Sequence, residues 1–222
     1  MISVLLAACG GEPYIHEQVA SILPQLAPGD ELLISDDAPE LRLAFDDPRI
    51  RYMAGPRQGV VRNVEFLLTQ AQGDILVLCD QDDMWLPGKL DISRNLLNMR
   101  VDLHPPLLAH AAHTTDEHLN ITGRVCARPG MLRNIIKNTY TGCCMAFTRE
   151  LLPHVLPFPS NIPMHDQWIA LQAERHGRVI VHDEPLILWR RHSNTQTGHR
   201  TTLRQKLTWR WQIICALITN LH

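Results

Sequence analysis

The stretch ILVLCDQDD at residues 75–83 decides the fold, because five apolar residues stop abruptly at three aspartates. A short, nearly continuous apolar run is typical of a strand that is buried on both faces of a parallel sheet. In open α/β sheets, ligands bind beyond the carboxyl ends of the strands. The acidic cluster therefore predicts a polar site at one edge of a sheet.

The segments before this stretch repeat the pattern of a strand followed by a helix. Apolar strands are predicted at residues 2–8, 31–35 and 50–53, and apolar residues at helical spacing predict helices over 13–26 and 63–72. Gly73 is in a position to end the second helix. Helix-sized crossovers between strands indicate an α/β, Rossmann-like domain, with a mostly parallel mixed sheet flanked by helices.

The second half of the chain is less regular. We expect a helix over 90–99 and another from Asp166, short strands at 107–113, 179–182 and 186–189, a strand or buried turn at 141–148, and loops over 120–138. The predicted organisation is one domain over residues 1–200 and a C-terminal helix, first basic and then apolar, over 201–222.

Composition excludes several classes of protein. The 222 residues are 45% hydrophobic and 20% charged, which excludes a disordered chain. A net charge of −2 gives no general attraction to nucleic acid, so no nucleic-acid partner is expected. The six cysteines show no CxxC spacing and the N-terminus has no basic leader, so we expect reduced thiols in a cytoplasmic protein. No apolar run reaches the length of a membrane-spanning helix.

Two acidic clusters are candidate ligand-binding groups. Asp80, Asp82 and Asp83 repel one another unless a cation compensates, and their oxygens suit Mg²⁺ or Mn²⁺. The alternative is a solvated acidic turn, although the apolar residues that follow are not typical of a solvated face. Asp36 and Asp37 can accept hydrogen bonds from a base or a ribose, and an Asx turn is the alternative there.

Two further groups carry ionisable side chains near predicted element ends. Asp166 either caps its own helix or acts as a base, and a helix N-terminus favours the ionised carboxylate in both cases. The run Arg190-Arg191-His192 follows an apolar strand. It is either a solvated basic edge or a clamp for a diphosphate, which guanidinium groups bind well.

Seven stretches together resemble family 2 glycosyltransferases, which have the GT-A fold. Within that family they are similar to bacterial rhamnosyltransferases of cell-surface polysaccharide assembly. In chain order, the stretches are ISVLLA at 2–7, EQVASIL at 17–23, LLISDDA at 32–38, DILVLCDQDDMWLPGKL at 74–90, YTGCCMAFTREL at 140–151, HDQWIALQAERHG at 165–177 and PLILWRRHSNTQTG at 185–198.

This resemblance implies a role for each matching residue. Asp166 would be the general base and Asp82 would hold the divalent metal, Mg²⁺ or Mn²⁺. His192 would approach the metal or the diphosphate, with Arg191 beside it. The donor nucleotide would be bound by Ala7, Asp36, Asp37, Arg62, Asn63 and Asp80, the last at the ribose. We expect Gly142, Cys143, Cys144 and Met145 to shape the acceptor pocket, with Trp168 beside it.

The predicted function is inverting transfer of a sugar, with rhamnose as the specific candidate, from a nucleotide-diphosphate donor to a saccharide or lipid-linked acceptor. Two segments depart from the family pattern: Cys9-Gly10-Gly11 replaces the usual Tyr-Asn-Gly, and the crossover over 38–47 is short. The alternatives are a metal-dependent nucleotidyltransferase or phosphohydrolase, which also use aspartates on α/β sheets, and an inactive module that binds nucleotide sugars.

The C-terminal helix has two possible roles. Arg204, Lys206 and Arg210 precede an apolar end, and Trp209 and Trp211 suit the headgroup level of a membrane. Its larger apolar residues are predicted to share one broad face: Leu203, Leu207, Ile214, Leu217, Ile218 and Leu221. This face predicts either peripheral contact with the inner side of the cell membrane or packing on the chain's own domain or on a twin subunit in a homodimer.

Overall fold

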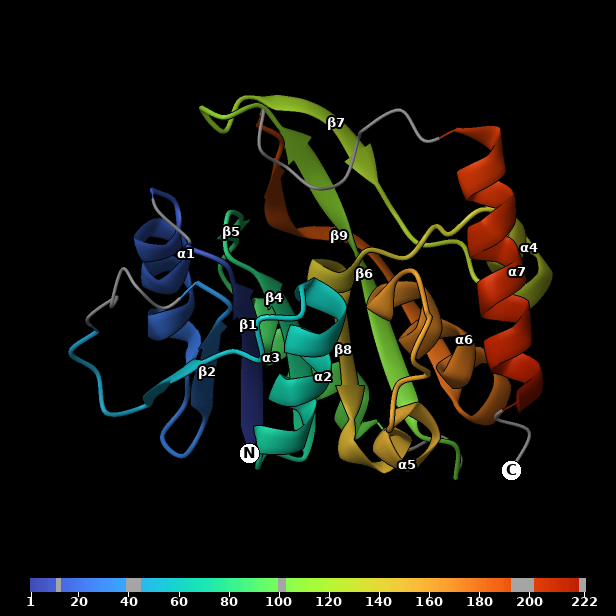
Figure 1. The fold of residues 1–222 in the computed structure, drawn as a ribbon. Coiled ribbons are helices and arrows are strands. Elements are labelled where there is room, and N and C mark those ends of the chain that lie inside the picture. Colours follow the sequence, from blue (N-terminus) through green and yellow to red (C-terminus); the bar gives the residue numbers. More distant parts are fainter. Residues whose placement is uncertain (11–12, 39–44, 100–102, 193–201, 220–222) are drawn as a thin grey trace.

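The computed structural model describes residues 1–10, 13–38, 45–99, 103–192 and 202–219. The first half forms a parallel sheet (Figure 1). Strand β1 (Ile2–Ala8) lies between β2 (Glu31–Asp36) and β4 (Ile75–Asp80) and is parallel to both, and β3 (Ile50–Ala54) extends the sheet beyond β2. The predicted α/β fold with a mostly parallel core is therefore confirmed.

The second half extends the same sheet in mixed directions. Strand β8 (Met145–Thr148) is antiparallel to β4 and to β6 (Pro106–Thr115). The long β9 (Arg178–Arg190) runs parallel to β6, and the short β5 (Met84–Trp85) pairs with β9. Strand β7 (Ile121–Val125) forms a hairpin with β6 at one edge of the fold.

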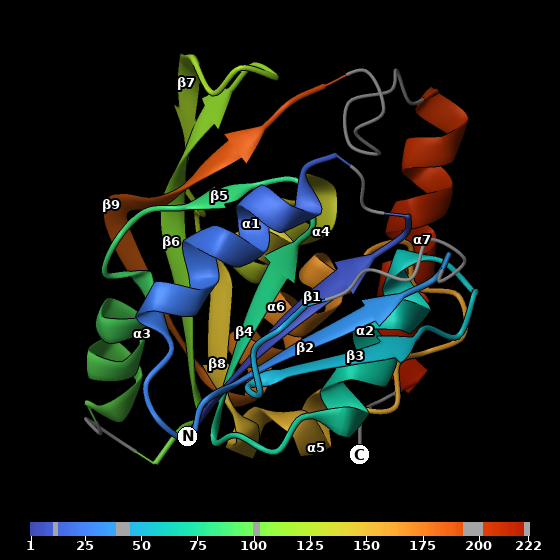
Figure 2. The same cartoon turned by 90° about the vertical axis from the view of Figure 1, so that its left-hand side faces the viewer.

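Helices cover both faces of the sheet (Figure 2). Alternate strand residues point to opposite faces, so Val4, Leu6 and Val77 pack with α1 (Ile15–Ile22), its extension η1 (Leu23–Gln25) and α3 (Lys89–Asn98). Leu5, Leu76 and Leu78 pack with the helices of the other face. These are α2 (Val60–Gln70), η4 (Arg149–Leu151), α5 (Leu152–Val155) and α6 (His165–His176).

The register places the carboxyl ends of three strands at one edge. Ala7 pairs with Ser35 on one side and with Asp80 on the other, so β1, β2 and β4 end together. Residues from distant parts of the sequence therefore meet at this edge. The helix η3 (Gly142–Cys144) packs against β4 there and is followed by β8.

Three local predictions were wrong. Residues 120–138 contain β7 and the short helix α4 (Met131–Ile136), and the two short strands predicted between 179 and 189 are one strand, β9. Helix α2 is capped by Ala71 instead of Gly73. Gly73 is needed for close approach, because a Cβ there would lie 2.6 Å from the backbone nitrogen of Ser3.

The C-terminal helix α7 (Leu203–Thr219) packs at the side of the domain, next to α4 and α6 (Figure 1). The burial of its apolar residues is uneven: Ile213, Ala216 and Leu217 are buried, whereas Leu203, Leu207, Trp211 and Ile218 are exposed. Leu221 lies outside the described residues. Among the described helices, none is both long and apolar enough to cross a bilayer.

Candidate functional site

The acidic cluster meets the end of β9. His192 Nε2 lies 2.8 Å from Asp82 Oδ2, although the two residues are 110 positions apart in the sequence. Strand β5, just after the acidic cluster, pairs with β9 and holds the two segments together. The fold thus brings together the two residues predicted to hold a metal.

Arg190 organises this junction, and sequence reasoning missed it in favour of Arg191. Its guanidinium Nε donates to the carbonyl of Asp82 at 2.9 Å and Nη1 donates to the carbonyl of Glu117 at 2.8 Å. The side chain also pairs with Glu17 of α1 and lies over the ring of Tyr14. Only 4% of Arg190 is exposed. Its guanidinium is therefore part of the framework that fixes residues 80–83, which we call the acidic loop.

The carboxylates of the acidic loop are buried close to one another, and this raises the pKa values of two of them. Burial and the neighbouring Asp82 raise the pKa of Asp80 to about 6. Burial, followed by the charges of Asp80 and Asp82, raises the pKa of Asp83 well above its usual value. Asp83 Oδ1 accepts the backbone N–H of Arg190 at 3.1 Å, whereas its buried Oδ2 has no hydrogen-bond partner.

These carboxylates fit a divalent cation. One ligand atom from each of Asp80, Asp83 and Cys143 lies within 4.8 Å of the others. Two carboxylates with raised pKa values and an unpartnered buried oxygen are a donor set that a bound cation would stabilise. Because hard cations prefer oxygen, the Asp80, Asp82 and Asp83 carboxylates suit Mg²⁺ or Mn²⁺ better than the Cys143 thiol does.

Lys89 lies beneath this loop and was not predicted from the sequence. It is fully buried, its Nζ donates to the carbonyl of Cys143 at 2.7 Å, and it lies over the Trp85 ring. Burial lowers the pKa of Lys89, while the nearby Asp83 carboxylate acts against that shift. Lys89 therefore links the segment that follows the acidic loop to η3.

Asp166 lies in the first turn of α6, within electrostatic range of Asp80. Burial raises the pKa of Asp166 to about 6, although its carboxylate accepts the N–H of Gln167 at 2.6 Å and the nearby Asn138 side chain acts against the shift. Its neighbour His165 is also close to Asp80, and burial lowers the pKa of that imidazole. At neutral pH the site therefore offers an ionised carboxylate next to a neutral imidazole.

Gly142 provides the room that His165 occupies. A Cβ at Gly142 would lie 2.8 Å from His165 Nε2. We expect Gly142→Ala to displace the imidazole and, with it, the start of α6. Small misplacements of catalytic groups cost up to about 100-fold in rate. The rate of the reaction that this site catalyses should fall by about 10- to 100-fold in this variant, with a nearly unchanged melting temperature.

Gly123→Ala is the matched control for this prediction. A Cβ at Gly123 would lie 2.9 Å from Thr114 Oγ1, which is a similar clash, but in the β6–β7 hairpin. If both variants lose the same activity, or if neither does, the fit of Gly142 against His165 has no catalytic meaning.

The predicted donor residues lie at the ends of β1 and β2. Asp36 is buried and accepts hydrogen bonds from the backbone of Gly10 and Ala38 and from Tyr52 Oη at 2.8 Å. Asp37 accepts the N–H groups of residues 57 and 59, both at 2.9 Å. Both carboxylates thus shape the loops at this edge. The hydrogen bond from the Ala38 N–H to Asp36 is the Asx turn that was the alternative for this position.

Asn63 joins the same two strand ends. Its Nδ2 donates to the carbonyls of Ala8 and Ser35, at 3.1 and 2.9 Å. Its buried Oδ1 has no hydrogen-bond partner. Ala7 lies on the central strand beside Asp80. Ala7, Asn63 and Asp80 are therefore brought together at the edge where a ligand of this fold class binds.

Two predicted basic residues contact other parts of the fold. Arg62 pairs with Glu65, and its guanidinium also donates to the carbonyls of Phe158 and Pro159, at 3.2 and 3.0 Å. It therefore fastens α2 to the segment before α6. The Arg191 guanidinium lies over the Trp189 ring, 4.7 Å from its centroid.

The predicted acceptor residues need correction. Cys143, Cys144 and Met145 are buried beneath the site, and Trp168 is buried with Nε1 donating to the carbonyl of Val155 at 2.9 Å. Side chains that pack in the core cannot contact an acceptor in this conformation. Only Gly142, although buried itself, borders the candidate base through His165.

An aromatic residue reaches the site from α1. The segment Cys9-Gly10-Gly11 lacks the aromatic of the family pattern, and Gly11 and most of the short crossover lie outside the described residues. Tyr14, which precedes α1, has its ring 5.0 Å from that of His192. The structure therefore places an aromatic ring beside the acidic loop, a few residues later in the chain than the family pattern has it.

Comparison with known sequences agrees with this geometry. Residues 3–102 match the family described as Glycosyl transferase family 2. The chain is 23% identical over 166 residues to the Escherichia coli protein UDP-Glc:alpha-D-GlcNAc-diphosphoundecaprenol beta-1,3-glucosyltransferase WfgD. That alignment covers 72% of this chain and 64% of WfgD. The chain therefore spans less than two thirds of this relative.

Solved structures share the fold. Residues 1–349 of S. aureus TarS in complex with UDP-GlcNAc superpose with a TM-score of 0.70 and 17% identity, over 90% of this chain and 61% of TarS. The Pyrobaculum calidifontis mannosyltransferase PcManGT, in complex with GDP-Man and Mn²⁺, gives 0.61 and 18% identity over 99% of this chain and 62% of its own. The chain therefore shares the fold of these two solved glycosyltransferases.

Proposed function

We propose that this chain is an inverting glycosyltransferase that moves a hexose from a nucleotide-diphosphate donor to a saccharide or lipid-linked acceptor. One observation carries the proposal: the Asp82–His192 pair and the carboxylate of Asp166 lie at one edge of the sheet, with Asp80 close to both. An acidic site for a diphosphate-bound cation and a separate carboxylate base are the two parts that the reaction needs.

The donor side rests on the ends of β1, β2 and β4. Asp82 and His192, with Asp80 beside them, would hold a divalent cation. Such a cation supplies charge neutralisation as the diphosphate departs. Arg190 keeps the acidic loop in position, and Asn63 and Asp36 keep the neighbouring strand ends in position for the nucleotide.

Asp166 provides the acceptor chemistry. Its carboxylate takes the proton from the acceptor hydroxyl while that oxygen forms the new glycosidic bond and the donor diphosphate leaves with the bonding electron pair. A single displacement inverts the anomeric carbon. The His165 imidazole, held by Gly142, keeps the start of α6 close to Asp80.

Two observations bear on which sugar is transferred. The seven sequence stretches favour rhamnose, whereas WfgD is named as a glucosyltransferase. The acceptor named for WfgD is a lipid-linked diphosphate sugar, which supports a role in cell-surface polysaccharide synthesis. All six cysteines are free thiols, which supports the proposed cytoplasmic location, where reduced thiols persist.

A donor screen tests the proposal. The melting temperature of the full chain is measured with glucosyl, rhamnosyl, N-acetylglucosaminyl and mannosyl nucleotides, with Mn²⁺ and with EDTA. A bound donor stabilises the folded state by mass action. Stabilisation by one donor, followed by its turnover with an acceptor, supports the proposal. Release of free phosphate or nucleotidyl transfer would favour the phosphohydrolase or nucleotidyltransferase alternatives, and donor binding without turnover would favour the inactive module.

The pKa of Asp166 predicts the pH dependence of transfer. A base must be ionised to take a proton, so kcat/KM should fall below pH 6 because the pKa of Asp166 is about 6. Asp80 has a similar pKa, but a bound cation favours its ionised form and moves its titration to lower pH. At saturating Mn²⁺, the fall of kcat/KM at low pH should therefore reflect the protonation of Asp166. A flat profile between pH 5 and about 8 would contradict its role as base.

A further inference from the structure

Helices α4 and α7 together form an exposed face that is both apolar and basic. Its apolar members are Leu132 and Ile136 of α4 and Leu203, Leu207 and Trp211 of α7, which are between 55% and 78% exposed. Its basic members are Arg128, Arg133, Lys137, Arg204, Lys206 and Arg210. We call this set of residues the α4–α7 face.

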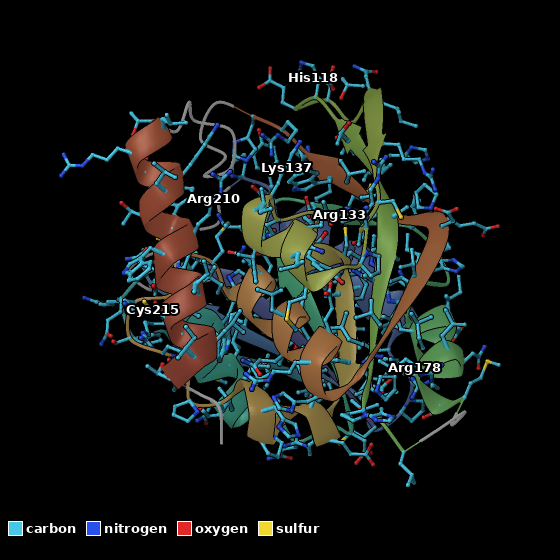
Figure 3. All side chains as sticks on the ribbon, turned by 90° about the vertical axis from the view of Figure 1, so that its right-hand side faces the viewer. His118, Arg133, Lys137, Arg178, Arg210 and Cys215 are labelled. Atoms are coloured by element: carbon cyan, nitrogen blue, oxygen red, sulfur yellow. The ribbon has the colours of Figure 1, made fainter. Side chains whose placement is uncertain are left out.

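The two helices are joined directly. Arg210 Nε donates to the carbonyl of Ile136 at 2.9 Å. Figure 3 shows Arg210 between the two helices, Lys137 at the end of α4, and Arg133 on the side of α4 that faces away from α7. At about 100° per residue, Leu203 and Leu207 lie within about 60° of Arg210 around α7. These two leucines are therefore on the side of α7 where α4 lies.

The charge of this face is unusually one-sided. Residues 118–149 and 185–222 contain no aspartate or glutamate. In the described part of the chain, none of the six basic side chains forms an ion pair with a carboxylate. The nearby Glu174 is engaged by Tyr140 Oη at 2.6 Å and by the start of α4. The cations are therefore available to an external anion.

A hollow in the same face suits a phosphate headgroup. Arg128, Arg133 and Lys137 line a cavity of about 480 Å³ together with Cys126 and Thr139. Guanidinium and ammonium groups are strong donors to phosphate oxygens. The hollow lies beside the exposed ridge formed by Leu132 and Ile136, one helical turn apart.

We propose that the α4–α7 face docks on the surface of an anionic lipid bilayer. The exposed leucines, isoleucine and Trp211 would enter the boundary between headgroups and acyl chains, and the cations would bind the lipid phosphates. A second copy of the chain fits less well, because a symmetric dimer would bring two sets of six cations together. A nucleic acid would leave the apolar side chains in water.

The docking face adjoins the candidate base. Asn138 follows α4, and its side chain lies close enough to Asp166 to favour the ionised carboxylate. If the proposed function holds, an acceptor carried by a lipid would reach Asp166 from this side. Docking itself does not depend on the proposed function, because it is measured without any sugar.

Co-sedimentation with vesicles tests the inference. The full chain should pellet with vesicles of phosphatidylcholine and phosphatidylglycerol at low salt, and not with phosphatidylcholine alone. Each basic residue near an anionic surface contributes about fivefold in affinity. Arg133→Gln with Lys137→Gln should therefore weaken binding about 25-fold, and Leu207→Glu with Trp211→Glu should abolish it.

Exposed residues away from this face provide the control. Met99 and Leu103 are exposed near the opposite end of the sheet, so Met99→Glu with Leu103→Glu should bind vesicles like the parent chain. All variants should keep the parent melting temperature, because they replace exposed side chains. The inference is overturned if the parent chain stays in the supernatant, if both pairs of glutamate substitutions have equal effects, or if Leu207→Glu with Trp211→Glu dissociates a dimer without weakening vesicle binding.

Discussion

Replacing Asp166 by asparagine should lower the rate of sugar transfer by ~10²–10⁴-fold, the usual contribution of a general base. Asparagine keeps the shape and the hydrogen-bonding capacity of the side chain, but it cannot take a proton. Donor affinity should survive, because the Asp82–His192 pair is untouched. The measurement is kcat for transfer together with the donor dissociation constant from calorimetry.

Asp91→Asn is the matched control for this substitution. Asp91 also lies in the first turn of a helix, α3, and is exposed. If Asp166 only stabilises the start of α6, both substitutions should cost a few tenths of a kcal/mol to about 1 kcal/mol in stability and leave transfer intact. Parent-like transfer by the Asp166→Asn variant would therefore reduce Asp166 to a helix-capping residue and remove the proposed base.

The central strands and their acidic ends were predictable because they are local patterns. Apolar runs that stop at Asp36 and at Asp80 identify buried strands and their ends without any knowledge of the neighbours. Parallel pairing then predicts that these strand ends meet at one edge of the sheet, and the register of Ala7 with Ser35 and Asp80 confirms it. Strand β9 was harder to predict from the sequence, because its exposed and buried residues alternate unevenly along 13 positions.

The framework of the site was less predictable, because it depends on contacts between distant residues. Arg190 and Arg191 are adjacent and chemically identical, and only the pairing of β9 with β5 and β6 turns one inward to Glu17 and leaves the other over Trp189. The burial of Lys89 is likewise invisible in a sequence where lysine is normally exposed. The adjacent Cys143 and Cys144 resemble pocket residues by motif, yet both pack in the core.

Replacing Asp82 by asparagine should abolish the effect of metal on donor binding. In the parent chain, Mn²⁺ should tighten the binding of a nucleoside diphosphate, because the cation joins the diphosphate to carboxylates that otherwise repel it. Outer-sphere partners of metal ligands already contribute about 10- to 100-fold in affinity, so loss of a direct ligand should cost at least about 100-fold. Calorimetry with Mn²⁺ and with EDTA measures the difference.

His192→Ala separates a metal ligand from a simple hydrogen-bond partner of Asp82. Because Asp82 and His192 are 2.8 Å apart, both variants should lose the response to Mn²⁺ if the pair holds the cation. His118→Ala, in the exposed turn between β6 and β7, is the control and should respond like the parent chain. Equal nucleoside-diphosphate affinity with EDTA and with Mn²⁺ in the parent chain would remove the cation from the proposal, and diphosphate binding would then depend on protein cations alone.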